Sequence, residues 1–96
     1  MGAEANGGFV KRKERFAKLA EIGCIICGQP PQIHHLIGVK YKGMGQKADD
    51  QYTIPLCLDH HTGQNGIHQM GKRPWEAAFG TQEELLEKTN DKLDGY

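Results

Sequence analysis

The chain has 96 residues, of which 38% are apolar and only 7% aromatic, and it contains 13 glycines. A single domain of this size and composition can form only a modest core, so we expect a metal ion to supplement the packing. No apolar stretch reaches the length of a membrane span, and the first residues lack the pattern of a signal peptide. We therefore expect a soluble cytoplasmic protein with a flexible leader, residues 1–8, and one folded domain, residues 9–96.

The net charge is zero, because 12 basic residues balance 12 acidic ones, but the two signs are unevenly distributed. Residues 9–73 carry ten Lys/Arg against five Asp/Glu, a balance of +5, whereas residues 74–96 carry two against six, a balance of −4. The basic part of the chain suits a polyanionic partner, and the acidic end is expected to face elsewhere.

Apolar residues recur at helical spacing between Phe9 and Glu21, which predicts an amphipathic helix that ends at Gly23. Two short segments with β-branched or aromatic residues follow, Gln32–Leu36 and Gln51–Leu56. They predict a ribbon of two strands, joined by a long connection rich in Gly and Lys.

Two helices are predicted at the end of the chain. Pro74 suits the first residue of one of them, and Thr81 with Glu84 has the form of a capping box that opens the other. Trp75, Phe79 and the leucines that follow are expected to pack against the first helix.

All three cysteines and all five histidines fall between Cys24 and His68. The odd number of cysteines and the Cys-x-x-Cys pair argue against disulfides and for thiolates kept reduced in the cytoplasm. Two tight turns, Cys24-x-x-Cys27 and Cys57-x-x-His60, each offer two ligands, which predicts a tetrahedral structural Zn²⁺. The alternative is that the thiols are merely buried or that one of them is reactive.

The remaining histidines are candidates for a second site. Adjacent side chains on a strand point to opposite faces, so one of His34 and His35 can hold a metal ion while the other serves as a general base. If His60 binds the zinc, His61 is turned toward the second site. His68 can join it only if the glycines between them break the helix, because seven helical residues span ~10.5 Å. The reserve ligands are Asn65, Asp49 and Asp50.

The order Cys-x-x-Cys, His-His, Cys-x-x-His-His and a further His resembles the HNH endonucleases, which have the ββα-metal fold. Three stretches, Ile54–His61, Gly66–His68 and Trp75–Thr81, narrow the resemblance to phage-type recombination-enhancement (Ref) nucleases, which depend on RecA. The resemblance covers about Gly23–Leu93. It implies a small α+β protein whose zinc-stabilised ββα-metal core carries an N-terminal helix and C-terminal helices.

The resemblance also implies roles for individual residues. His35 would activate the attacking water, and His34, His61 and His68 would hold the catalytic cation, Mg²⁺ or another divalent ion. The substrate would be DNA, with a RecA-type recombinase filament as a candidate partner in the bacterial host cell of a bacteriophage, in DNA recombination. The basic residues expected to bind phosphates are Lys40, Lys42, Lys47, Lys72 and Arg73.

Two features depart from the HNH pattern, and one of them is that the final histidine, His68, follows His61 after six residues instead of the usual three. The Asn that usually orients the general base would fall near Gln51 or Tyr52, so another group, such as the backbone or Asn65, has to hold His35.

The main alternative function is a non-catalytic, zinc-stabilised module that binds nucleic acid or protein. A zinc deaminase is disfavoured, because no His-x-Glu precedes a Pro-Cys-x-x-Cys in this chain.

Overall fold

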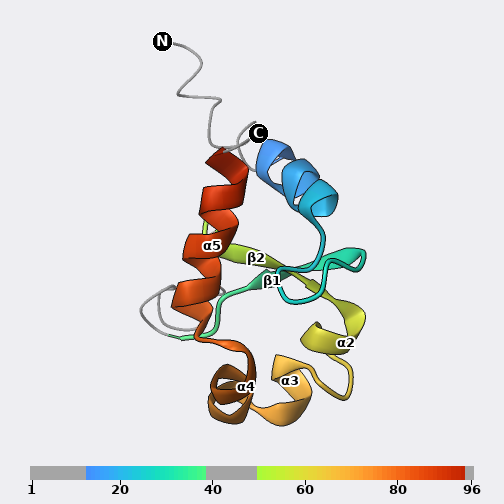
Figure 1. The fold of residues 1–96 in the computed structure, drawn as a ribbon, viewed down its shortest axis with the longest axis vertical. Helices are drawn as coiled ribbons and strands as arrows, with labels where there is room; N and C mark the ends of the chain where they lie inside the picture. Colours follow the sequence, from blue (N-terminus) through green and yellow to red (C-terminus); the bar gives the residue numbers. More distant parts are fainter. Residues whose placement is uncertain (1–12, 39–49, 95–96) are drawn as a thin grey trace.

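The computed structural model of the chain describes residues 13–38 and 50–94, and the predicted leader lies outside them. Residues 13–22 are helical, and the later elements are β1 (Pro31–His35), β2 (Thr53–Cys57), α2 (Leu58–His61), α3 (Ile67–Met70), α4 (Lys72–Phe79) and α5 (Gln82–Asp94). The described part is a small α+β fold, as predicted (Figure 1). No helix in these two ranges combines the length and the apolar character that a membrane span needs.

The two predicted strands form one antiparallel ribbon, in which His34 pairs with Ile54 and His35 with Thr53. Each strand is displaced by one or two residues from its predicted bounds. The pairing nevertheless continues past the end of β1, because the Leu36 N–H donates to the Tyr52 carbonyl over 3.0 Å. The predicted end of the first helix is confirmed, since residue 23 lies just outside it.

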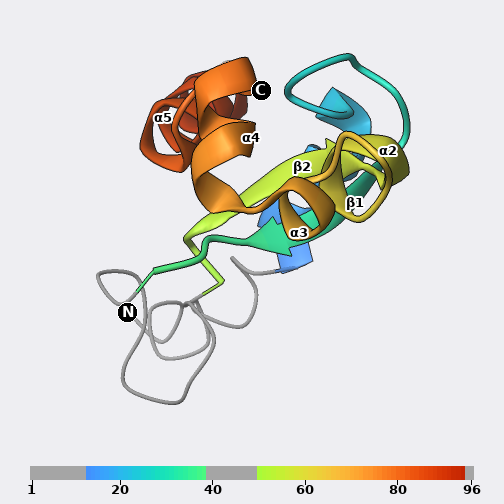
Figure 2. The ribbon, with the colours of Figure 1, turned by 90° about the horizontal axis from the view of Figure 1, so that it is seen from below.

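Every residue of β2 is buried, whereas His34 is the only buried residue of β1. The difference arises because β2 is also covered by α5, while α2 packs against both strands. Figure 2 shows α4 and α5 together on one side of the ribbon. The core cluster consists of Cys24, Leu36, Ile54, Leu56, Cys57, Ile67, Trp75 and Leu85.

Both predicted C-terminal helices form, and one of them begins earlier than predicted. Helix α4 begins at Lys72, two residues before the predicted start, and Pro74 is still accommodated because N–H groups in a first turn have no partner within the helix. The predicted capping box is confirmed. The Glu84 N–H donates to Thr81 Oγ1 and the Thr81 N–H donates to Glu84 Oε1, each over 3.0 Å.

The predicted packing of Trp75 and Phe79 against the first helix is wrong. Helix α4 lies at the opposite end of the molecule from residues 13–22 (Figure 1). The Trp75 ring is instead buried in the core cluster, with its Nε1–H donating to the Asn65 carbonyl over 2.9 Å. Phe79 packs edge-on against the His60 ring at a centroid distance of 5.0 Å. Both aromatic rings therefore support the segment that carries the later histidines.

Arg15 joins the first helix to the ribbon and to α5. Its Nε and Nη2 donate to Thr53 Oγ1 and to the Thr53 carbonyl over 2.8 and 2.7 Å, and its Nη1 donates to Asn90 Oδ1 over 3.0 Å. Thr53 Oγ1 in turn donates to the Asp50 carbonyl over 2.8 Å. One half-buried guanidinium thus ties together three segments that lie far apart in the sequence.

We expect Arg15→Ala to lower the free energy of unfolding by about 1–3 kcal/mol, because partly buried acceptors on Thr53 and Asn90 lose a charged donor. Urea unfolding followed by circular dichroism measures this loss. Glu21→Ala, an exposed change on the same helix, is the control and should stay within about 0.5 kcal/mol of the unchanged protein. Equal stability of the two variants would contradict the role given to Arg15.

Candidate metal centres

Four side chains meet where the turn before β1 approaches the end of β2. The ligand atoms of Cys24, Cys27, Cys57 and His60 all lie within 4.8 Å of one another. Cys27 Sγ lies 3.6 Å from Cys57 Sγ, and His60 Nδ1 lies 3.8 Å from Cys24 Sγ and 3.1 Å from Cys57 Sγ. In a tetrahedral zinc site with bonds of ~2.3 Å, neighbouring ligand atoms are roughly 3.8 Å apart. This four-ligand cluster, as predicted, could hold an ion such as Zn²⁺.

The backbone brings the two halves of the four-ligand cluster together. Gly23 has a φ of +82°, and a Cβ there would lie 2.6 Å from the Gly28 carbonyl oxygen, so only glycine permits this turn. The Ile25 N–H donates to the Pro55 carbonyl over 2.9 Å. This hydrogen bond holds the Cys-x-x-Cys turn against β2, whose last residue is Cys57.

The surroundings of Cys24 favour its thiolate. Burial raises the pKa of the Cys24 thiol, but the backbone N–H groups of Cys57, Cys27 and Ile26 outweigh this effect and bring the pKa below its usual range. One of these donors, the Ile26 N–H, lies 3.4 Å from the sulfur. The thiolate is the form that binds metal ions.

A second group, the three-histidine cluster, consists of His34 from β1, His61 from α2 and His68 from α3. Their ligand atoms also lie within 4.8 Å of one another. The ring centroids of His34 are 5.1 Å from those of His61 and 5.4 Å from those of His68, and the last two rings are 4.8 Å apart. His34 is 1% exposed, whereas His68 is exposed, so the cluster opens to solvent on the side of α3.

The chain reverses between α2 and α3, and this brings His68 back to His61. A Cβ on Gly66 would lie 2.6 Å from the His61 carbonyl oxygen, so the close approach requires glycine. Asn65 Nδ2 donates to Asp59 Oδ2 over 2.9 Å and braces the turn. The predicted break of the helix between the two histidines is therefore confirmed.

Two members of the three-histidine cluster, His34 and His61, are held in the neutral state that binds metal ions. Burial, with the neighbouring His61, His68 and His35, lowers the pKa of His34 to about 4 although the hydrogen bond to Gln82 raises it. Burial also lowers the pKa of His61, and His68 adds to this effect. At neutral pH the imidazoles of His34 and His61 thus present lone pairs rather than charges.

His35 has different surroundings from its neighbour, as the alternation along a strand predicted. Its Nε2 lies 2.8 Å from Asp50 Oδ1, its side chain is 20% exposed, and its ring meets Phe16 edge-on at 6.4 Å. The partner of His35 is therefore a carboxylate, and neither Asn65 nor a backbone group was needed to explain its orientation. Asp49, the other acidic reserve ligand, lies outside the described residues.

The predicted phosphate-binding residues are only partly described. Lys40, Lys42 and Lys47 lie outside the described ranges. Lys72 and Arg73 are exposed in the first turn of α4, which packs against the helix that carries His68. Lys72 Nζ also lies 3.7 Å from Glu76 Oε1, one helical turn away.

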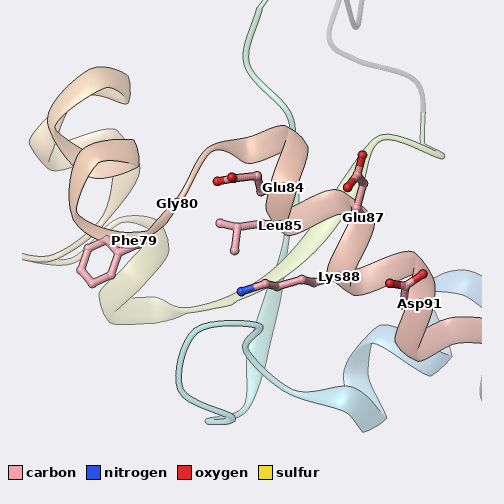
Figure 3. Close-up of a pocket in the computed structure, with 7 residues that line it drawn as sticks. All are labelled: Phe79, Gly80, Glu84, Leu85, Glu87, Lys88 and Asp91. Atoms are coloured by element: carbon pink, nitrogen blue, oxygen red, sulfur yellow. The ribbon is translucent and has the colours of Figure 1, made fainter.

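A pocket of about 270 Å³ lies apart from both clusters, between the end of α4 and the outer side of α5 (Figure 3). Three carboxylates and one lysine line it, together with apolar atoms, and none of the candidate ligands does. An acidic lining does not suit a phosphate group, so this pocket is not a candidate for the predicted substrate. The residues that line it are Phe79, Gly80, Glu84, Leu85, Glu87, Lys88 and Asp91.

Two polar side chains that contact the histidines are not predicted as site residues by the sequence pattern. Gln32 Oε1 lies 2.8 Å from His61 Nδ1, and Gln82 Oε1 lies 3.0 Å from His34 Nε2. The sequence contains one indication that Gln82 is buried, because Gln82 precedes Leu85 by three residues and so lies on the buried face of the same helix. A polar residue at such a position needs buried partners.

The fold and the two clusters define a small α+β protein with two groups of side chains that could bind metal ions. The chain belongs to the family described as "Protein of unknown function (DUF968)", whose model matches residues 11–93. It is 37% identical over 82 residues to the uncharacterized protein YdfU of Escherichia coli (strain K12), a match that covers 83% of this chain and 22% of that protein. The chain thus spans about a fifth of this relative's length. No solved structure matches the chain.

Proposed function

We propose that this chain is a metal-dependent DNA endonuclease of the HNH type, with a ββα-metal core formed by β1, β2 and α2. The observation that carries the proposal is the three-histidine cluster, which is separate from the four-ligand cluster and open on one side. A cluster closed by four ligands suits a structural ion, whereas three ligands leave coordination positions for a substrate oxygen. The two clusters therefore match two different tasks.

A divalent cation held by His34, His61 and His68 would bind a non-bridging phosphate oxygen and stabilise the leaving 3′ oxygen. Three imidazole ligands favour a transition metal such as Zn²⁺ or Ni²⁺ more than they favour Mg²⁺, which prefers oxygen ligands. The expected products carry 5′-phosphate and 3′-hydroxyl ends. Assays of the protein should accordingly include these ions beside Mg²⁺.

His35 is the proposed general base. A neutral imidazole can take a proton from water at cellular pH. The Asp50 carboxylate accepts a hydrogen bond from His35 Nε2–H, which leaves Nδ1 with the lone pair that receives the proton. Asp50 would then perform the orienting task that an Asn performs in the HNH pattern.

The substrate partner in this proposal is DNA, bound without reading of bases. Lys72 and Arg73 at the start of α4 would bind phosphates, together with the lysines outside the described residues. A RecA-type recombinase filament is the proposed second partner, in DNA recombination in the cytoplasm of a bacterial host cell. Cleavage of single-stranded DNA with and without such a filament tests that part of the proposal.

The proposal predicts two bound metal ions per chain and DNA nicking that stops when EDTA is added. His34→Ala should lose one ion and the cleavage activity while retaining the ion of the four-ligand cluster, because His34 belongs only to the three-histidine cluster. Elemental analysis and a plasmid-nicking assay with Mg²⁺, Mn²⁺, Zn²⁺ and Ni²⁺ measure both quantities. Gln69→Ala, an exposed change beside His68, is the control and should keep both.

The second candidate function is a non-catalytic, zinc-stabilised module that binds nucleic acid or protein. The observation that favours it is that His34 is buried and His35 contacts Asp50, because packing and hydrogen bonding alone can account for both side chains. One bound ion per chain and no cleavage with any of the four metals would support this module and contradict the nuclease.

A further inference from the structure

Gln82, the first residue of α5, makes hydrogen bonds through both the oxygen and the nitrogen of its side-chain amide beside the three-histidine cluster. It is 1% exposed. Its Oε1 lies 3.0 Å from His34 Nε2 and accepts from the Ile37 N–H over 2.9 Å, and its Nε2 donates to the Ile37 carbonyl over 2.9 Å. A buried glutamine with every one of these contacts is held in a single orientation.

The two contacts with Ile37 determine which end of the amide faces His34. The Ile37 N–H can only donate and the Ile37 carbonyl can only accept, so Oε1 must lie toward the N–H and Nε2 toward the carbonyl. Exchange of the two ends of the amide would set donor against donor and acceptor against acceptor. The atom that faces His34 is therefore an acceptor.

This acceptor selects the tautomer of His34. The His34 Nε2 has to carry the proton and donate to Gln82 Oε1, which leaves Nδ1 with the free lone pair. We propose that Gln82 is a positioning residue that fixes this tautomer and holds His34 Nδ1 ready to bind a metal ion. A hydrogen bond on the far nitrogen also makes an imidazole a better ligand.

The start of α5 is anchored so that Gln82 stays in place. The Gln82 N–H donates to Glu76 Oε2 over 2.8 Å, and the capping box of Thr81 and Glu84 closes the first turn. Helix α5, which supplies none of the candidate ligands of either cluster, thus reaches the three-histidine cluster through the Gln82 side chain.

This inference rests on the proposed function insofar as it needs an ion at the three-histidine cluster, so its test measures metal binding without DNA. The full chain, with Zn²⁺ in the four-ligand cluster, is titrated with Co²⁺ and followed by visible absorption. Gln82→Met keeps the shape of the side chain but removes the acceptor, and we expect Co²⁺ to bind about 10–100-fold more weakly. Gln82→Glu keeps an acceptor for His34 and should bind Co²⁺ more tightly than Gln82→Met.

Thr89→Val is the matched control, because Thr89 is a buried polar residue of the same helix whose hydroxyl donates to the Leu85 carbonyl. It should bind Co²⁺ as tightly as the unchanged protein. An equal loss of affinity in Thr89→Val and Gln82→Met would show a general effect of disturbing α5 and would overturn the inference.

The tautomer itself gives a second readout that does not depend on metal affinity. Nitrogen-15 NMR of the protein without an ion at the three-histidine cluster should show His34 protonated at Nε2, and Gln82→Met should abolish this preference. His34 protonated at Nδ1 in the unchanged protein would overturn the inference. Failure of the unchanged protein to bind Co²⁺ at all would instead overturn the proposed function together with the metal-binding part of the inference.

Discussion

His35→Ala is expected to lower the rate of metal-dependent DNA cleavage by about 10²–10⁴-fold, the usual contribution of a general base. Both metal clusters should keep their ions, because His35 belongs to neither of them. Single-turnover cleavage of a plasmid measures the rate, and elemental analysis measures the metal content. The variant thus differs from His34→Ala, which should lose an ion as well as the activity.

Substitution of Asp50 tests whether the hydrogen bond that orients His35 contributes to the cleavage rate, while His35 itself stays in place. Asp50→Asn keeps an oxygen that can accept from His35 Nε2–H, whereas Asp50→Ala removes it. We therefore expect Asp50→Asn to retain more activity than Asp50→Ala at an equal substrate affinity. Cleavage by His35→Ala at the rate of the unchanged protein would exclude His35 as the base.

Loss of the ion from the four-ligand cluster is expected to unfold the protein. A structural zinc contributes about 10–16 kcal/mol of apparent binding free energy in small zinc domains, which is comparable to the whole stability of an ordinary domain, about 5–15 kcal/mol. In the described residues only ten apolar side chains are buried, and two of them are the candidate ligands Cys24 and Cys57. The core and the four-ligand cluster are therefore one structure, and we expect that packing alone does not replace an ion held there.

Cys57→Ser and a strong chelator provide two independent ways to remove this ion. Each should abolish the dispersion of the amide NMR spectrum and the cooperative thermal transition. His68→Ala is the control, since it removes a ligand from the three-histidine cluster and should leave the fold intact. A folded Cys57→Ser variant that binds no zinc would show that the apolar core is sufficient.

The four-ligand cluster could be predicted from short-range geometry, whereas for the three-histidine cluster this geometry left open which of His34 and His35 joins it, and only the resemblance to HNH endonucleases implied His34. Two residues separated by two others, as in Cys24-x-x-Cys27, share one turn, and neighbours on a strand, as in His34 and His35, face apart. The place of His68 was predictable for a related reason. Glycines between His61 and His68 interrupt the helix that would otherwise separate the two imidazoles.

The partners of these histidines could not be predicted in the same way. Asp50 reaches His35 across the ribbon, and Gln82 reaches His34 from a helix 48 residues later in the chain. Such contacts depend on where whole elements pack, and the sequence pattern predicts the wrong helix as the partner of Trp75 and Phe79. Because the packing of α4 is predicted wrongly, the position of the start of α5, which follows α4 in the chain, cannot be predicted either.

The sequence by itself determined which cysteine and histidine side chains share a turn, because a short spacing between two ligands fixes their separation through only a few residues of backbone. Only the tertiary structure decided which ring nitrogen of His34 and of His61 faces an acceptor and which is left for a metal ion. That choice depends on acceptors such as Gln32 and Gln82, which are brought to His61 and His34 by strand pairing and by the docking of α5. Hydrogen bonds between distant elements depend on how the core packs, and residue spacing along the chain does not predict them.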